Sequence, residues 1–130
     1  MAEMSNYLEN ALLNATLNAT TYTAPANIYV SLWTSDPTDA GSGTEVSGGS
    51  YQRTEVTFPA ASGTSGNVLN DAAVEFPQAT GTWGTIGWIG INDAQTGGNL
   101  LYHTALTTSK AIDTGDIFKI AIGSLSVTLA

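Results

Sequence analysis

The chain has no cysteine, very few positive charges and no long apolar segment. The lack of cysteine excludes disulfide bonds, thiolate zinc sites and thiol nucleophiles. Lysine and arginine together number 3 against 11 acidic residues, so the 130-residue chain has a net charge of -8. Because so few cations cannot neutralise a run of phosphates, nucleic acid is not expected as a partner. An anionic membrane would repel the chain, and no apolar run approaches the roughly 20 residues of a membrane span.

What the chain does contain is enough apolar sequence for one core. Hydrophobic residues make up 42% of the sequence and are spread along it, whereas charged residues make up only 11%. The length lies within the usual range of one domain, so we predict a single domain over residues 1–130. Its surface should consist mostly of uncharged polar side chains.

The first twenty residues carry the only convincing helical pattern. Met4, Leu8 and Leu12 recur at helical spacing, together with Ala11 and Ala15, which predicts one face of an amphipathic helix within residues 1–20. Ser5 is the expected N-cap.

From residue 27 onward the apolar residues alternate with a period of two. Ile28–Trp33 is expected to be a strand with one apolar face and a second, partly apolar face. Ile86–Ile91 is apolar on both faces, which is typical of a central buried strand. Turn signals at Gly97 and Gly98 predict a hairpin that returns over Asn99–Leu106. Seven or eight short strands without interleaved helices predict a mainly β fold, an antiparallel β-sandwich of jelly-roll type over residues 27–130.

Candidate catalytic and metal-binding residues are few. His103 is the only histidine, and it has no sequence motif around it that supplies a nucleophile, so a structural or surface role is expected. No Gly-x-Ser-x-Gly motif occurs, and no paired carboxylates are marked as buried. We therefore predict a non-enzymatic protein with no cofactor. Aspartates at Asp36–Asp39, Asn92–Asp93 and Asp113–Asp116 are expected to form turns, although calcium binding by one of these loops stays open.

The aromatic residues suggest a possible carbohydrate contact. Trp88 lies in the most apolar strand and should belong to the core. Trp83 lies in a glycine-flanked loop and is the tryptophan best placed to be exposed. We name Trp83 as the candidate sugar platform, against core packing or an interface anchor as the alternatives.

An ordered set of blocks resembles a family of small structural proteins of tailed bacteriophages, often labelled tail-fibre-like. The resemblance covers nearly the whole chain and brings no catalytic residues that map onto it. It rests on Ser5–Asn10, Thr34–Asp39, Gly41–Tyr51, Trp83–Leu101, Leu106–Thr108 and Gly115–Leu125.

This resemblance implies a structural virion protein that works with other phage proteins, either the major capsid protein or tail proteins. Since one compact domain cannot make a long fibre, we expect a small surface unit that decorates or cements the capsid. The alternative is a tail-fibre or tail-tip module that binds host-surface carbohydrate, and an enzyme is a distant third. We expect a homo-oligomer, with a trimer favoured, held by the terminal helix or by the loop 38–50. The named interface candidates are Met4, Leu8, Leu12, Val46 and Tyr51.

Overall fold

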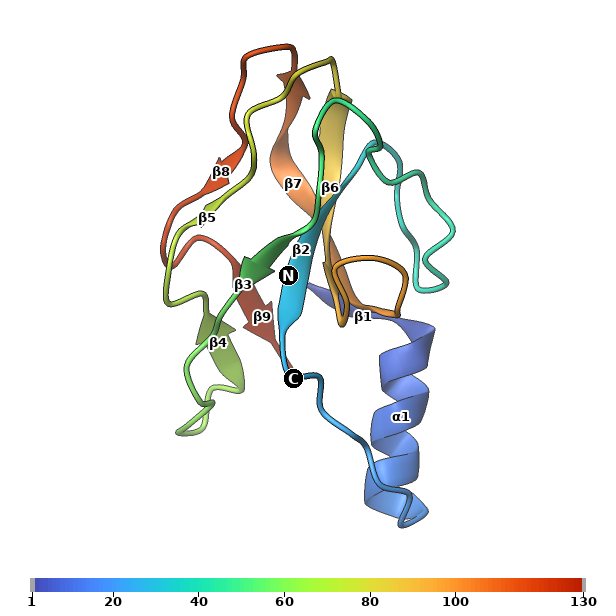
Figure 1. Ribbon diagram of the computed structural model, residues 1–130. Helices are drawn as coiled ribbons and strands as arrows, with labels where there is room; N and C mark the ends of the chain where they lie inside the picture. Colours follow the sequence, from blue (N-terminus) through green and yellow to red (C-terminus); the bar gives the residue numbers. More distant parts are fainter. Residues whose placement is uncertain (1, 130) are drawn as a thin grey trace.

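The computed structural model describes residues 2–129 and has a mainly β architecture with antiparallel pairing and one N-terminal helix (Figure 1). This confirms the predicted class. None of the described helices is long and apolar enough to cross a membrane. The elements in chain order are β1 (Glu3–Met4), α1 (Asn6–Leu17), β2 (Ile28–Trp33), β3 (Thr54–Val56), β4 (Asn67–Leu69), β5 (Val74–Glu75), β6 (Gly84–Asn92), β7 (Leu100–Ile112), β8 (Lys119–Ile120) and β9 (Ser126–Thr128).

The main sheet has five strands in the order β1-β7-β6-β2-β3. Strand β6 lies in the middle, where Ile86, Ile89 and Ile91 are all buried, as their run of apolar residues predicts. Its partner β7 extends to Ile112, further than the predicted end at Leu106. The hairpin prediction is therefore right, but its returning strand is longer than the period of the sequence indicates.

The pairing of β6 with β7 is interrupted by a large irregularity. Ile86 pairs with Lys110, whereas Trp88 pairs with Ala105. One residue of β6 thus faces four unpaired residues of β7, so β7 bulges away from the sheet. Alternation alone does not reveal such an insertion, because the residues on both sides of it keep an extended backbone.

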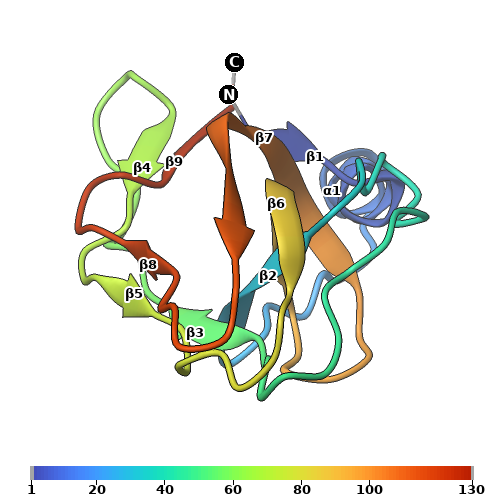
Figure 2. The same cartoon turned by 90° about the horizontal axis from the view of Figure 1, so that it is seen from above.

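Two small sheets, β4-β9 and β5-β8, complete the β structure. Seen from above, they lie across the molecule from β6 and β7 (Figure 2). The core fills the space between, and its buried members come from every one of these sheets. The antiparallel arrangement is thus confirmed, but the jelly-roll sandwich is not, because the pairing divides into one large sheet and two ribbons.

Helix α1 begins where the sequence predicts. The backbone N–H of Leu8 donates to the Oγ of Ser5, so Ser5 is the N-cap. The Ser5 N–H also donates to the carbonyl of Leu101 at 2.8 Å, which ties the start of the helix to β7. The short strand β1 before it escaped prediction. Beyond this tie the helix extends past the end of the sheet (Figure 1).

Candidate interaction sites

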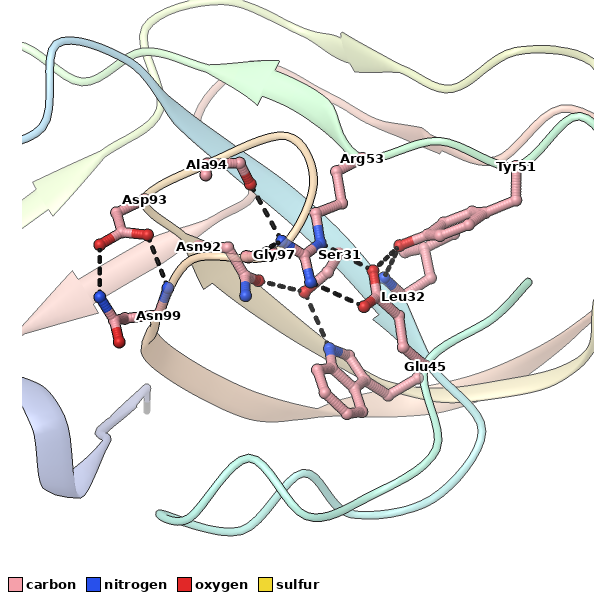
Figure 3. Close-up of polar contacts among 11 residues, drawn as sticks. Ser31, Leu32, Glu45, Tyr51, Arg53, Asn92, Asp93, Ala94, Gly97 and Asn99 are labelled. Carbon is pink, nitrogen blue, oxygen red and sulfur yellow. Dashed lines mark hydrogen bonds and ion pairs between the residues drawn. The ribbon is translucent and has the colours of Figure 1, made fainter. Parts of the chain in front are cut away.

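Arg53 holds two loops together. Its Nε and Nη2 donate to the carboxylate of Glu45 at 2.9 and 2.8 Å, a two-pronged ion pair (Figure 3). Its Nη1 donates to the carbonyls of Ala94 and Gly97 at 3.0 and 2.7 Å. The side chain thereby joins the loop after β2 to the β6–β7 turn. Hydrogen bonding to Glu45 raises the pKa of Arg53 above its usual value.

Tyr51 completes this cluster. Its hydroxyl donates to Glu45 at 2.6 Å and accepts from the backbone N–H of Leu32 at 3.0 Å. Burial, and then the bond to Glu45, raises the pKa of Tyr51 well above its usual range. Because these groups satisfy one another inside the chain, the cluster is a structural clamp and offers no free acid or base for catalysis.

A second set of linked side-chain hydrogen bonds lies next to the clamp (Figure 3). The indole Nε1 of Trp33 donates to Ser31 Oγ at 2.8 Å, and Ser31 donates to Asn92 Oδ1 at 2.7 Å. A Cβ on Gly90 would come within 2.7 Å of Ser31 Oγ. Glycine at position 90 is therefore required by this close approach.

Trp83 is not exposed, which corrects the prediction of an accessible ring. Only 4% of the residue is accessible. Its ring packs edge-on against Tyr51 and Phe76, at centroid distances of 5.4 and 6.5 Å, and its Nε1 donates to the carbonyl of Gly49 at 2.9 Å. Packing against the core thus takes the face that a sugar would need.

The predicted interface residues are distributed unevenly. Leu8 and Val46 are buried within this chain at 4% and 6% exposure, which leaves little of either side chain for a partner. Met4, Leu12 and Tyr51 are half-buried.

The apolar groups of the helix that do reach solvent are ones the sequence did not single out. They are Tyr7, Leu13 and Leu17, exposed at 42%, 55% and 80%. Extending the predicted apolar stripe to its neighbouring helix positions would have included the two leucines.

The loop carboxylates mostly bond their own backbone. Asp36 accepts from Thr38 N–H, Asp93 from Asn99 N–H, and Asp116 from the backbone of the same turn. These bonds support the turn prediction for all three loops.

His103 is buried and lies beside two carboxylates. Its Nε2 lies 2.8 Å from Asp39 Oδ1 and 3.9 Å from Glu3 Oε2. Glu3 and His103 are directly opposite in the β1–β7 pairing. No local motif indicates this cluster, because its members are distant along the chain.

An open groove between β3 and the loops beside it collects polar groups. The chain has only three glutamines, and Gln52, Gln78 and Gln95 all line this groove. Tyr29, Arg53, Thr54, Glu55, Glu75, Phe76, Pro77 and Ile117 also line it. The sequence did not predict this groove, because the three glutamines are far apart along the chain and come together only in the folded structure.

Comparison with known proteins identifies one matching family. The family model described as podophage GP4 fiber I protein gp80 matches residues 3–128. No curated protein matches the chain. The family's description favours a fibre over the leading expectation of capsid decoration, which gains no support from it.

Proposed function

Because the chain belongs to the podophage GP4 fiber I protein family, we propose that it is a globular unit of the phage tail fibre. Membership makes it a structural, non-enzymatic component of the virion. The match across residues 3–128 carries the proposal, since it spans the helix and every sheet. It also implies association with other tail proteins.

We place the assembly surface of this unit on α1. Of its 12 residues only Leu8 is buried, although isolated helices of this length are marginal in water. The exposed leucines therefore favour a neighbouring copy or another tail protein as cover. A closed ring of identical copies, with a trimer favoured, would cover this face on every subunit.

Immunogold electron microscopy tests the position in the virion. Antibody raised to this chain is applied to phage particles, with particles treated with pre-immune serum as the control. We expect gold on the tail. Gold spread over the heads would overturn the fibre proposal and restore capsid decoration.

A second candidate function is binding of host-surface carbohydrate by the glutamine groove. The observation that favours it is the gathering of all three glutamines on one open groove beside Tyr29. Primary amides both donate and accept hydrogen bonds, as sugar hydroxyls do, and a tyrosine ring offers an apolar face. Gln52 lies exposed just before β3, whereas the amides of Gln78 and Gln95 already donate to carbonyls of this chain, so we choose Gln52 for the test.

The experiment is a binding assay with purified surface polysaccharide of the host. Gln52→Ala is compared with Asn10→Ala, which removes an exposed amide from α1 instead. Loss of one hydrogen bond should weaken binding about threefold to tenfold in Gln52→Ala alone. Equal affinities for the two variants, or no binding by the wild type, would contradict a sugar site in this groove.

A further inference from the structure

We propose that Glu3, Asp39 and His103 form a binding site for a divalent first-row transition metal ion of the zinc type. The site lies where β1, the loop after β2 and β7 meet. It is separate from the glutamine groove, and it does not depend on the position of the protein in the virion.

The three side chains present ligand atoms at suitable spacing. Ions of this kind bind nitrogen and oxygen at about 2.0–2.2 Å, so two ligand atoms on one ion lie about 3–4 Å apart. His103 Nε2 lies 2.8 Å from Asp39 Oδ1 and 3.9 Å from Glu3 Oε2. All three atoms lie within 4.8 Å of one another. The 2.8 Å distance is that of a hydrogen bond, so a bound ion would replace the proton between His103 and Asp39 and move these two atoms slightly apart. The Glu3 carboxylate would turn toward them.

The charge of the cluster also matches a divalent cation. As metal ligands, two carboxylates and an imidazole without its proton at Nε2 would carry a charge of minus two. Among the described residues, Arg53 pairs with Glu45 and Lys119 with Glu75, and neither reaches this cluster. Neither Glu3 nor Asp39 forms an ion pair with a lysine or arginine in the part of the chain that the structure describes.

Burial and exposure divide the cluster into a fixed part and an open part. The His103 side chain is only 6% exposed, and its strand pairing with Glu3 fixes its position. The Glu3 and Asp39 side chains are 71% and 46% exposed, so an ion can enter from solvent and water can fill its remaining positions.

The mixed donor set selects the class of ion. Calcium prefers six to eight oxygen ligands, whereas imidazole with carboxylates suits zinc and its neighbours. A bound ion would add a side-chain link among three segments that backbone hydrogen bonds already join. It would also fix the strand that leads into α1, since the Asn6 N–H already donates to the Asp39 carbonyl at 2.9 Å.

The test is calorimetric titration of zinc chloride into the full chain after removal of bound metal with a chelator. The variants are Glu3→Gln and Asp39→Asn, which keep the size of each side chain and leave the buried His103 in place. Glu9→Gln is the matched control, because Glu9 is an exposed carboxylate in the first turn of α1. Circular dichroism establishes that each variant is folded.

We expect one zinc ion to bind the wild type and Glu9→Gln equally, and binding to weaken about tenfold or more in the two site variants. Cobalt(II) in place of zinc should give a visible absorption band that the site variants lose. Absence of zinc binding by the wild type would overturn the proposal and leave the cluster as a hydrogen-bonded pair with a neighbouring acid. Binding by the site variants equal to that of Glu9→Gln would overturn it as well.

Discussion

Strand β6 and helix α1 place their apolar side chains in opposite environments. In β6, Ile86, Ile89 and Ile91 are exposed by 5% or less and belong to the hydrophobic core. In α1, Leu13 and Leu17 are exposed at 55% and 80%. Burial of apolar area is the main source of folding stability, so the isolated chain gains that stability from its sheets. The outer face of α1, which carries Leu13 and Leu17, is therefore available for another molecule.

The largest effect should come from truncating the core. Phe76 is 2% exposed and lies edge-on to Phe118, with ring centroids 5.6 Å apart. Phe76→Ala should lower the free energy of unfolding by about 3–5 kcal/mol, because it removes packing and leaves a cavity. Denaturant unfolding followed by tryptophan fluorescence measures this. A loss of unfolding free energy smaller than that of Leu17→Ser in α1 would contradict the view that the sheets supply the stability.

A smaller loss should follow from opening the clamp that joins the loops beside the sheet. Arg53→Met leaves two backbone carbonyls without a donor and Glu45 with the Tyr51 hydroxyl alone, and should cost about 2 kcal/mol of unfolding free energy. The matched control is Lys119→Met, which removes one partner of an exposed pair at 3.7 Å. Such pairs are worth about 0–1 kcal/mol. Equal costs in denaturant unfolding would show that the clamp contributes no more than a surface ion pair.

The clamp should also make stability depend on pH. Burial raises the pKa of Tyr51 in the folded state. The protonated Tyr51 hydroxyl therefore contributes fully to the free energy of unfolding below the unfolded-state pKa of about 10. This contribution is lost as the pH rises further, because the unfolded chain ionises first. Unfolding free energies measured between pH 9 and 11 should therefore fall less steeply in Tyr51→Phe than in the wild type. Tyr22 and Tyr102, whose pKa values burial also raises, keep some slope in the variant. Equal slopes of unfolding free energy against pH in the two proteins would show that Tyr51 does not cause this pH dependence.

The smallest change in the stability of the isolated chain should come from the outer face of α1. Leu17→Ser should alter the unfolding free energy by less than about 0.5 kcal/mol, since the side chain is already in water. Its effect should appear instead as weaker self-association in sedimentation velocity. Wild-type chain that stays monomeric at high concentration would leave another tail protein as the partner of this face.

The sequence predicted those elements whose cause is local. The N-cap at Ser5, the apolar strand β6 and the turn before β7 follow from neighbouring residues and were correct. The burial of Trp83 was missed because it depends on Gly49 and Tyr51, which approach only after folding. The cluster at His103 was missed for the same reason, since its partners lie 64 or more positions away along the chain.

The small sheets show a further limit of sequence patterns. In the largely apolar segment Ile117–Ile122, only Lys119–Ile120 pairs, and only with the two residues of β5. The extent of a strand is set by the length of the partner beside it. That length is a property of the tertiary fold, and period alone does not contain it.

Hydrogen–deuterium exchange, compared between the isolated chain and intact phage particles, tests directly whether another molecule covers α1 in the assembled fibre. We expect amides in the last turns of α1, around Leu13 and Leu17, to exchange fast in the isolated chain and slowly in the particle. Amides of β6 should be protected in both states, which makes them the internal control. Equally fast exchange of α1 in the particle would contradict the claim that this helix is covered when the fibre assembles.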